Sequence, residues 1–123
     1  MKPPALLDSF QNVPYKGQAF QLSETPDFSD WLGSLRDRRA RARIVVRLER
    51  LADGNFGDCK SVKGGVHELR VDYGPGYRVY FFQRGKELVI LLSGGDKRTQ
   101  DTDIAHAKRL KEEIERTNGD SPI

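Results

Sequence analysis

The residues with the clearest chemistry in this sequence are three arginines on or beside strand-like segments. Arg70 lies in the alternating run 66–73. Arg78 lies in the next run, 77–83, and Arg98 follows a third. A guanidinium group offers a planar fork of donors that suits phosphate oxygens. The placement therefore predicts a sheet that holds a phosphate group through these arginines, which become the candidate catalytic residues.

Side chains alternate across a strand, so the two runs divide into a core face and a second face. A symmetric hairpin places Asp72 opposite Arg78 and Arg70 opposite Tyr80. The second face then carries Glu68, Arg70, Asp72, Arg78, Tyr80 and Phe82. Arginines beside aromatic platforms suit single-stranded RNA, because each stacked base contributes ~1–3 kcal/mol. A plain ion pair between Asp72 and Arg78, worth about 0.2–1 kcal/mol, explains the same pattern equally well.

The turn Gly94-Gly95-Asp96-Lys97-Arg98 follows an apolar strand and opens the last helix. Two glycines permit close backbone approach, and a helix N-terminus attracts anions. Lys97 is therefore a candidate substrate-binding residue. Lys60 and Lys63, in the polar loop 53–65, could add charge to the same site, with Tyr80 as a stacking platform. The alternative is a turn whose cations are simply solvated.

A proton-transfer group is less evident than the positive charge. Metal-free RNA cleavage uses the 2′-hydroxyl as nucleophile and needs a base, an acid and positive charge on the phosphorane. His67 is expected on the core side of its strand, and His106 on the exposed side of the last helix. Asp96 and Tyr80 remain as candidate bases, and a lysine whose pKa is lowered among the clustered cations is a third.

Composition limits the classes of protein to consider. The 123 residues fit one domain, and 21 basic against 18 acidic residues give a net charge of +3. The single cysteine excludes an intrachain disulfide, and with two histidines it cannot form the usual four-ligand zinc site. No cofactor is expected. No run reaches the ~18 apolar residues of a membrane span, and a reducing, cytoplasmic location fits best.

The remaining elements predict an α+β fold. Thr25-Pro26-Asp27 starts one helix, Asp37 caps a second, and a last helix runs over 101–116. Strands are expected near 18–22, 66–73, 77–83 and 87–93. The order β-α-α-β-β-β-α implies an antiparallel sheet of about four strands, packed against a helical hairpin and a C-terminal helix. Residues 1–16 are expected to form a flexible arm, 17–117 the domain, and 118–123 a disordered tail.

The second helix is rich in arginine. Residues 36–50 contain seven arginines: 36, 38, 39, 41, 43, 47 and 50. A solvated helix face explains this pattern, and so does a surface that meets a polyanion or an acidic partner.

Two motifs resemble one known family. E-L-R-V-D-Y-G-P-G-Y-R-V-Y-F at 68–81 and L-V-I-L-L-S-G-G-D-K-R at 88–98 closely resemble the HigB-like branch of the RelE/ParE toxin superfamily. These are the addiction module killer proteins of type II toxin–antitoxin systems. The resemblance covers about residues 19–115, including F-x-x-W-L at 28–32.

The resemblance implies a small toxin that an antitoxin, expected to be a helix-turn-helix protein from the adjacent gene, neutralises by masking its basic site. It implies metal-independent, ribosome-dependent cleavage of mRNA, with Arg70, Arg78 and Arg98 matching the basic residues of cleaving members. The ParE-like members share the fold but inhibit DNA gyrase, which is the alternative function. A non-toxic relative that only binds RNA or an antitoxin is a third.

One position departs from the family pattern. The best-studied RelE-like nuclease carries a functional tyrosine in the first turn of the last helix, where this sequence has Ile104. Ile104 is expected in the core, so that catalytic role does not carry over.

Overall fold

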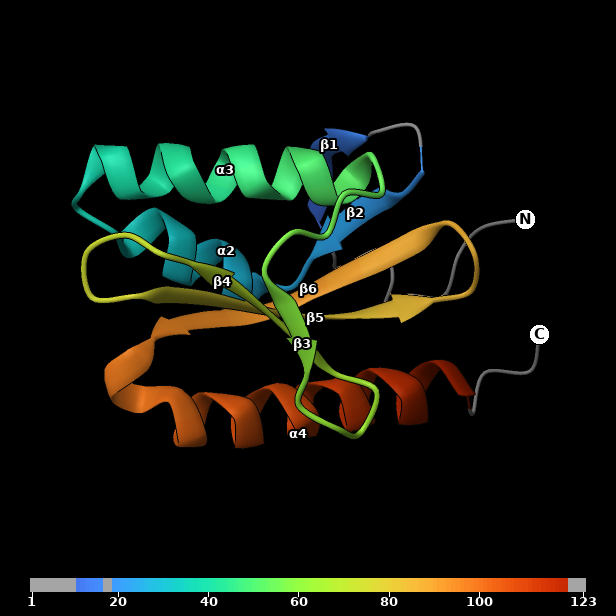
Figure 1. Cartoon of the computed structure of the whole chain (residues 1–123). Coiled ribbons are helices and arrows are strands. Elements are labelled where there is room, and N and C mark those ends of the chain that lie inside the picture. The colour runs from blue at the N-terminus through green and yellow to red at the C-terminus, as the bar shows by residue number, and fades with distance from the viewer. Residues whose placement is uncertain (1–10, 17–18, 120–123) are drawn as a thin grey trace.

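The computed structural model describes residues 11–16 and 19–119, which form an α+β fold (Figure 1). In chain order the elements are β1 (Gln11–Lys16), β2 (Gln21–Glu24), α2 (Pro26–Ser34), α3 (Arg38–Ala52), β3 (Cys59–Ser61), β4 (His67–Val71), β5 (Tyr77–Arg84), β6 (Leu88–Asp96), the 3-10 helix η1 (Lys97–Thr99) and α4 (Gln100–Gly119). The predicted α+β class is confirmed, and the predicted elements occur in their expected order with two further strands, β1 and β3.

The sheet is larger than expected. Its six strands lie in the order β1-β2-β6-β5-β4-β3, with β2 parallel to β6 and every other pair antiparallel. The short strands β1 and β3 fall where a flexible arm and a polar loop were predicted. Neither segment shows a sustained alternation in sequence, so only the pairing with neighbouring strands reveals them. The parallel pair corrects the expectation of a wholly antiparallel sheet.

The helix starts follow the capping rules. The Thr25 hydroxyl accepts a hydrogen bond from the Phe28 N–H at 3.1 Å, and Pro26 opens α2. The Asp37 carboxylate accepts from the N–H groups of Arg39 and Ala40, which fixes the start of α3. Both starts are as predicted.

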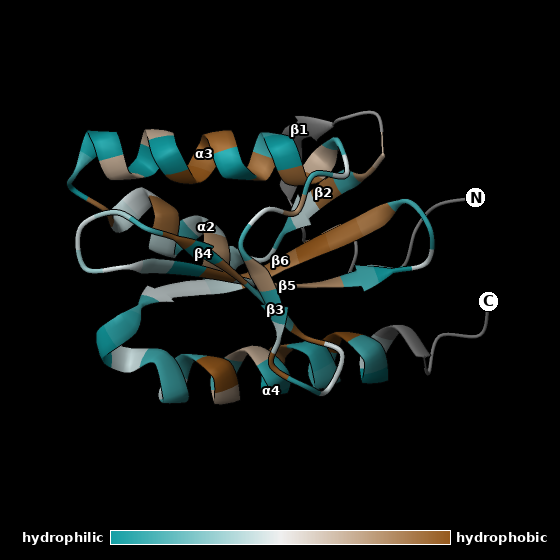
Figure 2. Ribbon diagram, in the orientation of Figure 1, coloured by the Kyte–Doolittle hydropathy of each residue, from teal (hydrophilic) through white to brown (hydrophobic). Residues whose placement is uncertain are grey.

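Helices cover both faces of the sheet, with α3 and α4 on opposite sides in Figure 1. One core, under α2 and α3, includes Leu22, Phe28, Ile44, Leu48, Leu69, Val79, Phe81 and Leu91. The other, under α4, includes Val66, Tyr80, Phe82, Ile90, Leu92, Ala107 and Ile114. Figure 2 shows α3 and α4 banded between hydrophilic and hydrophobic residues, while the middle of β6 is continuously hydrophobic. A strand covered on both faces has no polar side, which explains β6.

The β4–β5 hairpin corrects the predicted register. Arg70 lies opposite Arg78, and Val71 lies opposite Tyr77. The pairing is shifted by two residues from the symmetric arrangement, because the connecting loop is longer and uses positive φ angles of 56° at Gly74 and 84° at Gly76. A shift of two leaves every side chain on its predicted face but changes its partner.

The predicted ends of the chain are also revised. Residues 11–16 extend the sheet as β1 rather than forming part of an arm, and α4 runs to Gly119. Residues 1–10 of the predicted arm and 120–123 of the predicted tail lie outside the described residues.

Candidate functional site

A small cleft lies beside the β4–β5 hairpin and the end of β6. Its volume is about 250 Å³, and its lining residues are Asp58, Arg70, Val71, Asp72, Gly76, Arg78 and Lys97. It brings together two of the three predicted arginines and one predicted lysine, Lys97. Three cations and two carboxylates line one small concave surface.

Arg70 is held at the cleft by an exposed acid. Its guanidinium Nη2 lies 3.1 Å from Asp58 Oδ1, and its Nε donates to the same oxygen at 3.2 Å. The loop that carries Asp58 is fixed by Arg47 of α3, whose guanidinium donates to the carbonyls of Phe56, Asp58 and Arg70. An arginine of the helix thus organises the backbone behind the site.

Arg78 is the most buried cation of the cleft, at 8% exposed. Its Nη1 donates to the Gly76 carbonyl at 2.9 Å, and its Nε lies 3.6 Å from Glu68 Oε2. Its direct cross-strand neighbour is Arg70. Like charges directly opposite one another destabilise a sheet. The arrangement therefore favours an anion in the cleft between them.

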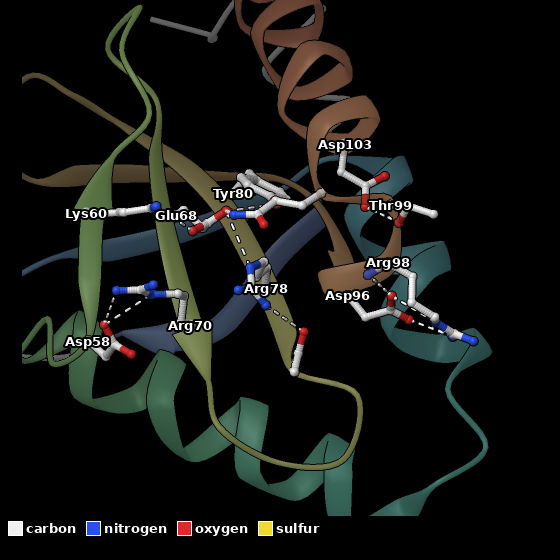
Figure 3. A network of polar contacts seen from close by, with 12 residues as sticks. Asp58, Lys60, Glu68, Arg70, Arg78, Tyr80, Asp96, Arg98, Thr99 and Asp103 are labelled. Carbon is white, nitrogen blue, oxygen red and sulfur yellow. Dashed lines mark hydrogen bonds and ion pairs between the residues drawn. The ribbon is translucent and has the colours of Figure 1, made fainter.

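Glu68 is a further candidate functional residue, which the sequence pattern alone does not single out. It is fully buried on the α4 side of the sheet. Its Oε2 accepts hydrogen bonds from the Tyr80 hydroxyl at 3.1 Å and from Gln100 Nε2 at 2.8 Å, and its Oε1 lies 3.9 Å from Lys60 Nζ (Figure 3). The sequence places Glu68 on the second face together with Tyr80. There, Tyr80 is interpreted as a substrate-binding residue, and Glu68 receives no role.

The second face is not an open surface, because α4 covers it. Tyr80 and Phe82 are buried, with 0% and 2% of their surface exposed. The expectation of an exposed stacking platform at Tyr80 is therefore wrong. Burial and the neighbouring Glu68 carboxylate also raise the pKa of the Tyr80 hydroxyl well above its usual value of 10. Tyr80 stays protonated at neutral pH and is a poor base.

Arg98 follows Lys97 in the chain but is not among the residues that line the cleft, and its side chain is 80% exposed. Its Nη2 lies 2.8 Å from Asp96 Oδ2, and Figure 3 shows its guanidinium directed away from Arg78. The hydrogen bonds from Arg98 lower the pKa of Asp96 below its usual value. Asp96, which also accepts from the Arg98 N–H to cap η1, is thereby a weaker base than an ordinary aspartate.

The two glycines of the turn serve packing. A Cβ atom on Gly94 would overlap the indole ring of Trp31 in α2, and one on Gly95 would overlap the carboxylate of Asp103 in α4. The space beside the two glycines, where we expect a phosphate to approach the backbone, is filled on each face of the sheet by a side chain of the protein itself.

The other predicted residues lie away from the cleft. The His67 ring stacks on Phe81 with centroids 5.5 Å apart. His106 Nε2 lies 2.7 Å from Asp27 Oδ2, which joins α4 to α2. Lys60 reaches toward Glu68, and Lys63 lies exposed in a turn. None of these four residues is among those that line the cleft.

Within the described residues, no group of three or more His, Cys, Asp or Glu side chains could hold a metal ion. None of the described helices is long and apolar enough to cross a membrane.

Comparisons with known proteins give a family and a fold. The family model of phage-derived Gp49-like proteins (DUF891) matches residues 30–115. A Haemophilus influenzae protein described as uncharacterized is 53% identical over 94 residues, covering 76% of this chain and 95% of its own. A solved structure of a double arginine-to-alanine mutant of the E. coli toxin RelE in the free state matches with a TM-score of 0.60. That match has 15% sequence identity and covers 75% of this chain and 98% of the other.

Proposed function

Because this chain belongs to the Gp49-like family of RelE-like toxins, we propose that it is the toxin of a type II toxin–antitoxin system and cleaves messenger RNA on the ribosome. Within the toxin superfamily, its sequence motifs favour the HigB-like branch. The proposed site of action is the cytoplasm, where translating ribosomes are found.

The observation that carries the proposal is the pair Arg70 and Arg78. They lie directly opposite one another on β4 and β5 and line the same cleft as Lys97. Each arginine already lies beside a carboxylate, Asp58 or Glu68, but the two like charges still repel one another across the strands. An anion bound between them reduces that repulsion. A phosphodiester that becomes a phosphorane gains negative charge, so fixed cations stabilise the transition state more than the ground state.

The proposed reaction is an intramolecular transesterification. The 2′-hydroxyl oxygen attacks the adjacent phosphorus and passes its proton to a base. The bond to the 5′-oxygen breaks, which leaves a 2′,3′-cyclic phosphate, and the departing 5′-oxygen takes up a proton from water to become a 5′-hydroxyl. Asp72 lines the cleft and is exposed, which places a carboxylate within the same concave surface. In this scheme Arg78 and Arg70 bear on the phosphorane, Lys97 binds the strand, and Arg98 adds charge from outside the cleft.

The test is cleavage of a defined mRNA on purified ribosomes, read by primer extension. The wild-type protein is expected to produce in-frame, translation-dependent cuts. Arg78→Ala should reduce the rate by about 100-fold or more, as removal of a transition-state donor does. Arg43→Ala, which removes an exposed arginine of α3, is the matched control and should cleave normally. Intact mRNA with folded wild-type protein would refute the proposal.

Gyrase inhibition is the second candidate. Ile104 packs partly buried against the core under α4, at the position where a cleaving relative carries a functional tyrosine. A supercoiling assay separates the two functions. Inhibited supercoiling with mRNA left uncut would favour the gyrase target.

The proposal includes an antitoxin as partner, expected from the adjacent gene. Co-expression of that gene product should relieve growth arrest and co-purify with this chain. Continued arrest in the presence of a stably produced adjacent gene product would reject it as the antitoxin.

A further inference from the structure

A buried carboxylate lies directly behind the deepest cation of the cleft. We propose that Glu68 is a positioning residue that fixes the Arg78 guanidinium toward the cleft. Only the kinetic consequence of this inference rests on the proposed function. The structural consequence, a fixed Arg78 side chain, stands by itself.

The contacts of Glu68 come from three separate elements. Tyr80 of β5 and Gln100 of α4 donate to Oε2 at 3.1 and 2.8 Å. Lys60 of β3 lies 3.9 Å from Oε1. Arg78 Nε lies 3.6 Å from Oε2, too far for a hydrogen bond but close enough for strong attraction. The two neutral donors hold the carboxylate still, so its charge has a fixed position relative to Arg78.

Burial of the Glu68 carboxylate lowers the stability of the fold, so its presence calls for a role other than stability. A fully buried carboxylate loses its hydration, and replacement of such a charge network by apolar groups is often neutral or stabilising. Oε1 of Glu68 and Nε of Arg78 are both buried without a hydrogen-bond partner among the described residues. Fold stability alone therefore gives little reason for a carboxylate at this position.

The carboxylate also counters the repulsion within the site. Arg70 lies directly opposite Arg78 and drives the two guanidinium groups apart. Glu68 attracts Arg78 from the α4 side, and the Gly76 carbonyl accepts from Nη1 at 2.9 Å. Arg78 is thereby kept at the cleft without an exposed acid that an incoming phosphate would have to displace. Arg70 and Arg98 differ from Arg78 in this respect, because they pair with Asp58 and Asp96, which a phosphate would have to displace.

The first experiment uses Glu68→Gln, which keeps the shape and one acceptor oxygen but removes the charge. The matched control is Gln100→Met, which removes a hydrogen bond to the same carboxylate but leaves its charge. In single-turnover cleavage on ribosomes, Glu68→Gln should lower the maximal rate about 10–100-fold, because small misplacements of a catalytic group have effects of that size. The half-saturating concentration should change less than about 3-fold, as expected for an interaction made only in the transition state. Gln100→Met should change the rate by less than about 3-fold, because the charge remains and the Tyr80 hydroxyl still donates to Oε2.

A double-mutant cycle separates positioning from a general effect on the fold. In the Arg78→Ala background, Glu68→Gln should cause no further loss, since it acts through Arg78. A full additional 10–100-fold loss in that background would overturn the inference. If Glu68→Gln does not fold, Glu68→Asp takes its place, because it keeps the buried charge but shortens its reach to Arg78.

The second experiment does not depend on cleavage. In a ¹⁵N–¹H correlation spectrum, the Nε–H signal of Arg78, assigned through its loss in Arg78→Ala, should persist in the wild-type protein. In Glu68→Gln it should shift and exchange faster with water, while Gln100→Met should keep it. An unchanged signal in Glu68→Gln overturns the inference even if the protein cleaves mRNA. A changed signal supports it even if the wild-type protein cleaves nothing, so the two proposals fail separately.

Discussion

Two groups of arginines in this protein differ in what their guanidinium groups contact. The site arginines, Arg70, Arg78 and Arg98, each lie within 4.0 Å of a carboxylate: Asp58, Glu68 and Asp96. The helix arginines of α3 are Arg38, Arg39, Arg41, Arg43, Arg47 and Arg50. Two of them, Arg43 and Arg47, contact an aromatic ring and backbone carbonyls. Each site arginine therefore has a carboxylate beside it, whereas these two helix arginines have uncharged partners.

The helix arginines have carbonyl, aromatic or apolar neighbours instead. Arg47 donates to three carbonyls, and the Arg43 guanidinium lies 4.6 Å from the Tyr73 ring centroid. Two open grooves, of about 480 and 710 Å³, flank the exposed Ala42 and Val46 of α3. The density of arginine in the sequence is therefore a poor guide to the site. The candidate site is distinguished by Arg70 and Arg78, which each lie beside a carboxylate and line one cleft.

The largest expected difference between the two groups is in catalysis. Arg70→Ala should lower the rate of mRNA cleavage by about 100-fold, because it removes a fixed cation beside the phosphorane. Its ion pair with Asp58 is exposed, so the free energy of unfolding should change by less than about 1 kcal/mol. Arg39→Ala on α3 is the control and should leave both quantities unchanged. The comparison fails if the two variants cleave equally.

A second prediction compares the contributions of two arginines within α3 to the stability of the fold. Arg47→Ala should lower the free energy of unfolding by about 1–3 kcal/mol, because partly buried carbonyls lose their donor. Arg50→Ala, on the exposed face of the same helix, should stay within about 0.5 kcal/mol of wild type. Urea unfolding followed by circular dichroism measures both. Equal values would mean that the Arg47 contacts contribute nothing measurable.

A third prediction concerns the turn that delivers Lys97 and Arg98 to the site. Gly94→Ala should destabilise the fold by about 1–3 kcal/mol, because the added methyl overlaps the Trp31 ring. Gly33→Ala is a matched control in α2, where an added Cβ meets nothing within 4 Å. It should stabilise the protein by roughly 0.5–1 kcal/mol, since alanine favours a helix. Thermal unfolding of the two variants should move in opposite directions.

The smallest expected effect is the pH dependence of the Asp96–Arg98 pair. Arg98 lowers the pKa of folded Asp96 below its usual value of 3.8. The pair therefore contributes stability that is present above that value and is lost as the pH falls through the lowered pKa. Because Arg98 is exposed, solvent screens the pair and the contribution should be small. Between about pH 5 and 2, the wild-type protein should lose more stability than Asp96→Asn. Parallel curves would contradict the prediction.

The sequence predicts local features of this fold well. The starts of α2 and α3 follow from the chemistry of Thr25 and Asp37, whose side chains accept the first free N–H groups of each helix. The division of β4 and β5 into two faces also holds, because a register shift of two preserves the alternation. Both features depend only on neighbouring residues.

Contacts between distant parts of the chain could not be predicted from the sequence. The partner of Arg78 changed from Asp72 to Arg70, because the loop conformation at Gly74 and Gly76 sets the register. The burial of Tyr80 follows from α4 packing over the second face, which no local pattern reports. The contacts of Glu68 come from β3, β5 and α4, which only the assembled fold brings together.

The two glycines at the end of β6 have an evolutionary consequence. Adjacent positions point to opposite faces, and each face is filled by a helix side chain: Trp31 at Gly94 and Asp103 at Gly95. Every other amino acid adds at least one carbon, so a change at either position is unfavourable unless its partner changes as well. Among related sequences, a larger residue at 95 should therefore occur together with a smaller one at 103, and likewise for 94 with 31. The two pairs join β6 to a different helix on each face of the sheet, so each pair should covary separately.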